Sequence, residues 1–196
     1  MKRILLFSTL AESNRKVVLS QLFPAAIQNK IFSFVPSNGV KDSESYIEQW
    51  QIIAQNYNAE FNVIDNSVND IEEQRKLLSS NIVLISGGNT FGLLQNLLNS
   101  GLDKSIRAFV KKPEFVLAGF SAGALVLTPT IEVCNLPDFD ENLVAIKDLT
   151  GLGIVNFEVF PHYDEHSQKV TLESYRKTTT NNVREITDED YISLDR

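Results

Sequence analysis

The chain has 196 residues, 43% hydrophobic and 22% charged, and this length and composition predict a single domain spanning residues 1–196. Its formal net charge of −7 argues against binding the phosphate backbone of nucleic acids, which requires clustered lysine and arginine. Cys134 is the only cysteine, which excludes an intramolecular disulfide. No stretch approaches the roughly 20 apolar residues of a membrane span. We therefore expect a cytoplasmic protein without nucleic-acid or membrane partners.

Short apolar runs alternate with helical patterns along the first two thirds of the chain. Five runs predict β-strands, at residues 3–9, 31–37, 61–65, 81–87 and 114–120. Between strands, apolar residues recur at helical spacing, as from Val17 to Ala26 and from Tyr46 to Ala54. The candidate helix caps are Ser13, Ser43 and Asp103. This alternation predicts an α/β fold with a mainly parallel sheet, helices on both faces, and a site at the carboxyl ends of the strands.

The last third of the chain is less regular. Residues 151–162 predict a strand pair or one long strand, and a polar helix follows at about 167–178. Residues 182–194 predict a terminal β-hairpin. The sequence contains no internal repeat, low-complexity tract or linker that would divide it.

The sequence AGFSAGALV, residues 118–126, places one serine among small residues where an apolar strand ends. Gly119 to Gly123 fit the G-x-S-x-G pattern of a nucleophile elbow, in which small neighbours allow a sharp strand-to-helix turn. The hydroxyl of Ser121 would then be exposed, and the N–H of Ala122 could stabilise a tetrahedral oxyanion. The alternative is a glycine-flanked serine in a phosphate-binding or packing turn.

A second glycine turn, SGGNTFGLL, ends the preceding strand. Neighbouring parallel strands would bring it close to Ser121, where the N–H of Gly88 could be a second oxyanion donor. The alternative is a simple turn in which Asn89 or Thr90 caps the next helix. The two interpretations are compatible, because the cap can position the amide.

A serine nucleophile needs a base, and the sequence contains only two histidines. His162 ends an apolar strand in VFPHYDEH, whereas His166 lies in a charged stretch, so His162 is the favoured base. A zinc site formed by His162, Asp164 and His166 is the metal alternative. It lacks a further ligand at a recognisable spacing, so we expect no metal ion and no cofactor.

The motifs SGGNTFGLL, GFSAGALVLTPTIE and PHYDEH together resemble the peptidase E family of serine peptidases, which includes the cyanophycinases. The resemblance implies a flavodoxin-like, doubly wound sheet related to that of the class I glutamine amidotransferases, whose elbow nucleophile is cysteine. It implies that Ser121 is the nucleophile, that His162 is the base, and that Gly88 and Ala122 form the oxyanion hole. Cys134 lies outside the elbow and is expected to be buried. The substrates implied are short peptides, with N-terminal aspartate as a candidate preference.

The family places the acid of its triad in a late turn before a strand. Matching that strand to residues 191–194 puts Asp188 at the acid's position, with Glu189 as the fallback. Asp164 and Glu165 follow the histidine too closely to reach the Nδ1 side of its ring. The alternative is that the acidic residues 188–190 form a solvated hairpin turn.

Two positions depart from the peptidase E pattern. Asn135 precedes Leu136 and Pro137 where the family has an aspartate just before a proline. The family also has an arginine-containing stretch shortly after its histidine motif, whereas this chain has Lys169 and no arginine before Arg176. A lysine offers a point charge instead of a bidentate fork.

Two other functions are compatible with these motifs. One is an esterase or amidase of another serine-hydrolase type, because acids such as Asp138 and Asp148 lie between Ser121 and His162. Against it, the chain lacks an HGGG-type oxyanion motif. The other is a non-catalytic, flavodoxin-like binding module that keeps the elbow without activity.

Overall fold

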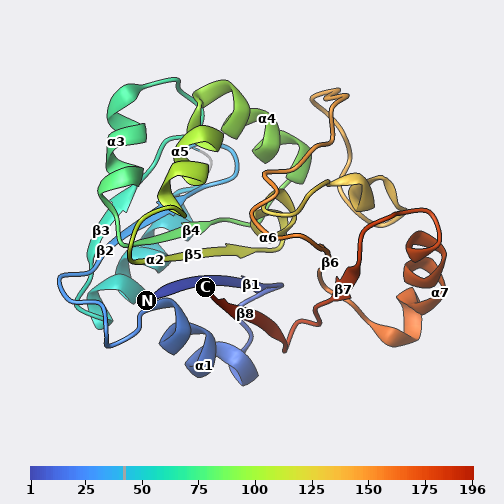
Figure 1. Cartoon of the computed structure of the whole chain (residues 1–196), viewed down its shortest axis with the longest axis horizontal. Helices are drawn as coiled ribbons and strands as arrows, with labels where there is room; N and C mark the ends of the chain where they lie inside the picture. The colour runs from blue at the N-terminus through green and yellow to red at the C-terminus, as the bar shows by residue number, and fades with distance from the viewer. Residues whose placement is uncertain (42) are drawn as a thin grey trace.

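A six-stranded sheet forms the centre of the computed structural model, which describes residues 1–41 and 43–196 (Figure 1). In spatial order its strands are β3 (Glu60–Val63), β2 (Ile31–Val35), β4 (Ile82–Ile85), β5 (Phe115–Phe120), β1 (Lys2–Phe7) and β8 (Tyr191–Asp195). The first five are parallel, and β8 runs antiparallel to β1 at one edge. The five strands predicted for the first two thirds of the sequence are confirmed, with ends that differ by one or a few residues. The mainly parallel α/β sheet agrees with a flavodoxin-like fold.

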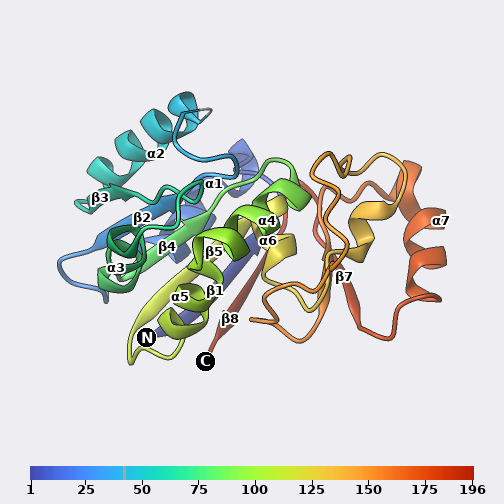
Figure 2. The ribbon, with the colours of Figure 1, turned by 90° about the horizontal axis from the view of Figure 1, so that it is seen from above.

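Alternate residues of β1 point into two different hydrophobic cores. Ile4 and Leu6 pack with α3 (Ile71–Ser79), α4 (Thr90–Ser100) and α5 (Leu102–Phe109). Leu5 and Phe7 pack on the opposite face with α1 (Glu12–Leu22) and α2 (Glu44–Asn56). These four side chains of β1 are fully buried. Figure 2 shows the two helical layers on either side of the sheet, so both faces are covered as the apolar strands predicted.

The remaining elements lie beyond one end of the sheet (Figures 1 and 2). They are α6 (Ala122–Val126), a 3₁₀ turn at Glu132–Asn135, β6 (Glu158–Phe160), α7 (Glu165–Arg176) and β7 (Val183–Glu185). The predicted terminal hairpin is wrong, because β7 pairs in parallel with β6 while β8 pairs with β1. The position of β8 is explained by the edge of the sheet, because β8 hydrogen-bonds to the backbone groups of β1 that would otherwise be unpaired. Arg3 on β1 also forms an ion pair with Asp195 on β8, at 2.8 Å. Of the strand predicted at 151–162, only β6 forms.

Two of the three predicted helix caps are wrong. Ser13 lies inside α1, whose N-cap is Ala11, and Asp103 lies in the first turn of α5, after Gly101. Ser43 does occupy the N-cap position of α2, without a side-chain hydrogen bond. The first helix also ends at Leu22, earlier than its apolar pattern predicts, because Pro24 cannot continue a helix. Within the described residues, no helix is long and apolar enough to cross a membrane.

A buried carboxylate connects α7 to the β6–β7 pair. Glu158 on β6 is fully buried and accepts hydrogen bonds from the hydroxyl groups of Tyr175 and Thr179 and from the amide of Asn181. Three donors compensate for the removal of this carboxylate from water. Burial, followed by the contact with Glu158, raises the pKa of the Tyr175 hydroxyl well above its ordinary value. Tyr175 therefore stays protonated and remains a donor in the folded protein.

We expect Tyr175→Phe to destabilise the fold by about 1–3 kcal/mol, because Glu158 loses a buried donor. A phenol whose pKa is raised by folding contributes stability below its unfolded pKa of about 10, and this contribution declines as pH rises above that value. Urea unfolding of both proteins at pH 8 and pH 10.5 measures the effect. The difference between wild type and variant should shrink at the higher pH, and an unchanged difference would contradict this assignment.

Candidate active site

Ser121 lies in the sharp turn that joins β5 to α6. Its backbone has φ 51° and ψ −117°, a conformation that residues with a side chain rarely adopt. Glycines on both sides are required sterically. A Cβ on Gly119 would lie 2.3 Å from the carbonyl oxygen of Gly123, and a Cβ on Gly123 would lie 2.1 Å from that of Ile85. The turn thus has the geometry of a nucleophile elbow at the carboxyl end of a central strand.

A chain of hydrogen bonds connects Ser121 to two residues from the last third of the sequence. The Nε2 atom of His162 lies 2.9 Å from Oγ of Ser121. The Nδ1 atom of the same ring lies 2.6 Å from Oδ1 of Asp188. His162 also has a positive φ, 56°, so two strained non-glycine residues face each other in one site. The three side chains that sequence analysis selected are therefore in direct contact.

Two buried polar residues hold the histidine and the aspartate in place, and sequence analysis missed both. The Ser8 hydroxyl accepts the backbone N–H of His162 at 2.9 Å and donates to the carbonyl of Ile186 at 2.8 Å. The Asn14 amide donates to the carbonyl of Asp188 at 3.0 Å. Ser8 directly follows β1, at the carboxyl end of a parallel strand. That position was a usable signal, because sites in such sheets form at these ends.

The glycine turn after β4 lies against Ser121, as its sequence position predicted. Gly88 has φ 143°, and a Cβ there would lie 2.2 Å from the hydroxyl oxygen of Ser37, so only glycine fits. The neighbouring Gly87 approaches Ser121 so closely that an added Cβ would be 3.1 Å from that of the serine. Asn89 caps α4 by accepting the N–H of Gly92 at 2.9 Å. The capping interpretation of this turn is correct, and Gly88 lines a common cavity with Ser121.

The other candidate residues do not join the hydrogen-bonded chain. Asp164 caps α7 by accepting the N–H of His166 at 3.0 Å, and hydrogen bonds from Ser167 and from that N–H lower the pKa of its carboxyl. His166 lies in the exposed first turn of α7. The backbone N–H of Glu189 donates a hydrogen bond to the hydroxyl group of Thr187, within the turn before β8. Within residues 1–41 and 43–196, no three His, Cys, Asp or Glu side chains gather as metal ligands would.

Cys134, the single thiol, is buried as expected. Burial is the main reason that its pKa is raised to about 12, and the nearby Asp140 acts in the same direction. A thiol with such a pKa carries almost no thiolate near neutral pH, so it is a poor nucleophile. Cys134 is therefore not an alternative candidate to Ser121 for a nucleophile.

Two cavities meet at Ser121 and His162. One, of about 170 Å³, is lined by Asp138, Asp140 and Gln168 in addition to these two residues, and we call it the acidic cavity. The other, of about 380 Å³, is lined largely by hydroxyl-bearing side chains and by Gly87 and Gly88, and we call it the hydroxyl cavity. A ligand spanning both would pass directly over the Ser121 hydroxyl.

Comparison with known proteins agrees with this architecture. The family model described as "Peptidase family S51" matches residues 4–194. An uncharacterized peptidase of Pasteurella multocida is 30% identical over 163 residues, covering 80% of this chain and 78% of the relative. Peptidase E of the same bacterium is 30% identical over 171 residues, covering 83% and 69%.

Solved structures show the same fold. A crystal structure of a provisionally assigned peptidase E from Listeria monocytogenes superposes with a TM-score of 0.79 at 23% identity, covering 99% of this chain and 94% of the other. A peptidase from an acI-B1 Actinobacterium gives a TM-score of 0.69 at 19% identity, covering 99% and 83%. At such identities the agreement concerns the fold.

We expect Gly123→Ala to destabilise the protein by about 3 kcal/mol or more, because the added methyl group meets the backbone of β4, which cannot move aside cheaply. Gly92→Ala is the matched control. It lies in α4 with only ordinary contacts, the nearest at 3.5 Å, and should gain about 0.5–1 kcal/mol of helix stability. Thermal and urea unfolding measure both variants. Equal effects on stability would contradict the close approach at the elbow.

Proposed function

The chain belongs to peptidase family S51 and is a serine peptidase, and on this premise we propose that it hydrolyses short peptides through an acyl-enzyme on Ser121. The observation that carries the proposal is the continuous hydrogen-bonded chain from Ser121 through His162 to Asp188. A serine hydroxyl is a weak nucleophile by itself, and such a chain is the arrangement that activates it.

In the proposed mechanism, the Oγ atom of Ser121 attacks the carbonyl carbon of the peptide bond while Nε2 of His162 takes its proton. The separation of 2.9 Å allows this transfer without movement of the backbone. His162 then gives the proton to the leaving amine, and the peptide C–N bond breaks. A water molecule, deprotonated by the same nitrogen, hydrolyses the ester and restores the serine.

Asp188 is the proposed orienting acid. Its carboxylate, 2.6 Å from Nδ1, accepts the N–H on that side of the ring and so leaves Nε2 free to act as the base. It also stabilises the imidazolium that forms after proton transfer. Asn14 fixes the backbone of Asp188 and Ser8 fixes that of His162, so both partners are held by buried groups.

The proposed oxyanion hole consists of the backbone N–H groups of Gly88 and Ala122. Two features support it: Ala122 begins α6 directly after the serine, and Gly88 lines the hydroxyl cavity together with Ser121, next to Gly87, which packs against the serine. Donors fixed by the backbone stabilise the developing negative charge without reorganising, and one such donor is typically worth about 10²–10³ in kcat.

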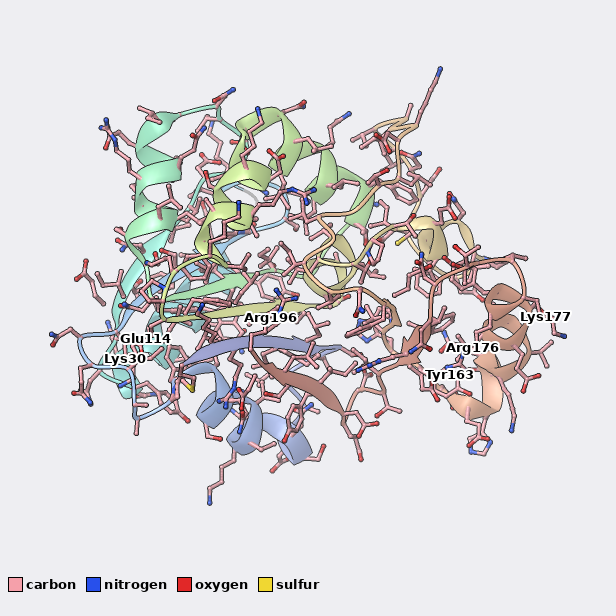
Figure 3. All side chains as sticks on the ribbon, viewed as in Figure 1. Lys30, Glu114, Tyr163, Arg176, Lys177 and Arg196 are labelled. Atoms are coloured by element: carbon pink, nitrogen blue, oxygen red, sulfur yellow. The ribbon has the colours of Figure 1, made fainter. Side chains whose placement is uncertain are left out.

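The first residue of the substrate is a separate question. The resemblance to peptidase E predicts N-terminal aspartate, for which a cation beside the nucleophile would be expected. Lys169 instead pairs with Glu165 at 2.8 Å. Arg176 pairs with Glu185 and the carbonyl of Val183, and Figure 3 shows it beside α7 and β7. We therefore propose peptide hydrolysis without a requirement for aspartate.

Ser121→Ala and His162→Ala should each abolish peptide hydrolysis, with a loss on the order of 10⁶ in kcat, because the nucleophile and base act as a unit. His166→Ala is the matched control and should retain wild-type activity, since His166 is exposed on α7. Hydrolysis of a dipeptide library by folded protein, together with labelling by a fluorophosphonate probe, measures this. Activity or labelling that survives Ser121→Ala would refute the proposal.

Asp188→Asn should lower kcat on the order of 10⁴, because an amide favours the wrong histidine tautomer. Two matched controls, Glu189→Gln and Asp164→Asn, remove neighbouring carboxylates that do not contact His162. Both should stay within a few-fold of wild type at equal folded concentration. If Asp188→Asn behaves like the controls, the site works as a Ser–His dyad.

A further inference from the structure

The acidic cavity places negatively charged side chains beside Ser121, the proposed nucleophile. Asp138 and Asp140 line it, and no lysine or arginine is among the described residues that do so. Its remaining lining residues are the apolar Leu125, Phe139 and Pro161 and the polar Thr90, Ser121, His162 and Gln168. A group that enters this space therefore meets carboxylates with no compensating cation.

Asp140 is held rigidly at the wall of this cavity. Its Oδ2 atom accepts the backbone N–H of Thr90 at 2.7 Å and also the Thr90 hydroxyl. Thr90 is the first residue of α4, so the carboxylate lies at the positive end of that helix. These two hydrogen bonds from Thr90 hold the carboxylate in the wall of the cavity.

Asp138 lies on the same loop and is more exposed. Its backbone has φ 70°, a conformation that aspartate tolerates better than most residues with a side chain. Asn135, where the peptidase E pattern has an aspartate, is not among the described lining residues of this cavity. The acidic groups of the loop thus occur three and five residues later in the chain.

The side of the cavity formed by α7 carries a neutral side chain and, within the described part of the chain, no cation. Gln168 is the residue of α7 that reaches the cavity, and its Oε1 atom accepts the N–H of Asp164 at 2.9 Å. The next residue, Lys169, is exposed and paired with Glu165. An acidic side chain in the cavity would find the Gln168 amide as a partner on this side, but no lysine or arginine among the described lining residues.

On the basis of the proposed function, we infer that the acidic cavity binds the N-terminal residue of the substrate and selects for a neutral or cationic side chain against an acidic one. The α-ammonium group lies next to the scissile carbonyl and needs an anionic partner, which Asp138 and Asp140 supply. The larger hydroxyl cavity then takes the leaving part of the peptide. A carboxylate on the first side chain would be repelled by both aspartates, whereas a lysine side chain would be attracted.

Matched dipeptides test the inference because they differ in charge and hardly in size. The pairs are Asp-Leu with Asn-Leu, and Lys-Leu with norleucyl-Leu. We expect kcat/KM for Asn-Leu to exceed that for Asp-Leu about tenfold or more, the scale of one like-charge contact near a protein surface. Lys-Leu should be at least as good a substrate as norleucyl-Leu. For both pairs, a higher salt concentration should bring the ratio of the two kcat/KM values closer to one.

Asp138→Asn removes one negative charge from the cavity at nearly constant volume. This substitution should reduce the ratio of kcat/KM for Asn-Leu to kcat/KM for Asp-Leu several-fold, mainly by improving hydrolysis of Asp-Leu. Asp148→Asn is the matched control: this exposed acid is on the same connection and bonds to the N–H of Thr150, but lies outside the cavity. It should leave the ratio unchanged.

The outcomes separate the inference from the function on which it rests. Ser121-dependent hydrolysis that favours Asp-Leu, or a ratio that Asp138→Asn does not change, would overturn the inference and leave the peptidase function intact. Absence of Ser121-dependent hydrolysis would overturn the function. In that case calorimetric binding of Asp-Leu and Asn-Leu to the folded protein still decides the charge preference, and tighter binding of Asp-Leu would overturn it.

Discussion

The close approach of backbone to backbone at the β5–α6 turn is the constraint on which the site depends. Gly119, Gly123 and the carbonyl of Ile85 meet at distances that leave no room for a side chain. This contact forces Ser121 into a positive φ, directs its side chain away from the turn, and holds it against the end of β4. The strain at Ser121 persists because β5, which is paired on both sides with β4 and β1 and is buried from Phe115 to Gly119, cannot relax around it.

The rest of the site is brought to this turn by the edge of the sheet. Because β8 returns antiparallel beside β1, the segment that precedes it passes the carboxyl ends of the parallel strands. Ser8 then connects β1 to both His162 and Ile186, and Asn14 connects α1 to Asp188. Residues far apart in the sequence are thus fixed relative to one rigid sheet edge, where the site must be positioned to within fractions of an ångström.

Sequence analysis was most successful where the chemistry depends on local patterns. The apolar strands, the elbow and the Asn89 cap follow from the spacing of a few residues, and each is confirmed. The partners of β7 and β8 were not predictable in this way, because two short strands joined by an acidic turn read as a hairpin whether or not they pair. Ser13 and Asp103 likewise have cap chemistry, but tertiary packing sets the ends of α1 and α5. Ser8 and Asn14 act through contacts across more than 150 residues, which no local pattern encodes.

The architecture separates the groups proposed for chemistry from those proposed for selectivity. The backbones of Ser121, His162 and Asp188 are held by the turn after β5 and by hydrogen bonds with the buried Ser8 and Asn14. Asp138 lies on an exposed connection, whereas Asp140 is tied to α4 through Thr90. A substitution at Asp138 therefore alters the charge of the acidic cavity without disturbing the elbow or the sheet edge. The charge of the acidic cavity can therefore change independently of Ser121, His162 and Asp188, because Asp138 lies on a different segment of the chain from these three residues.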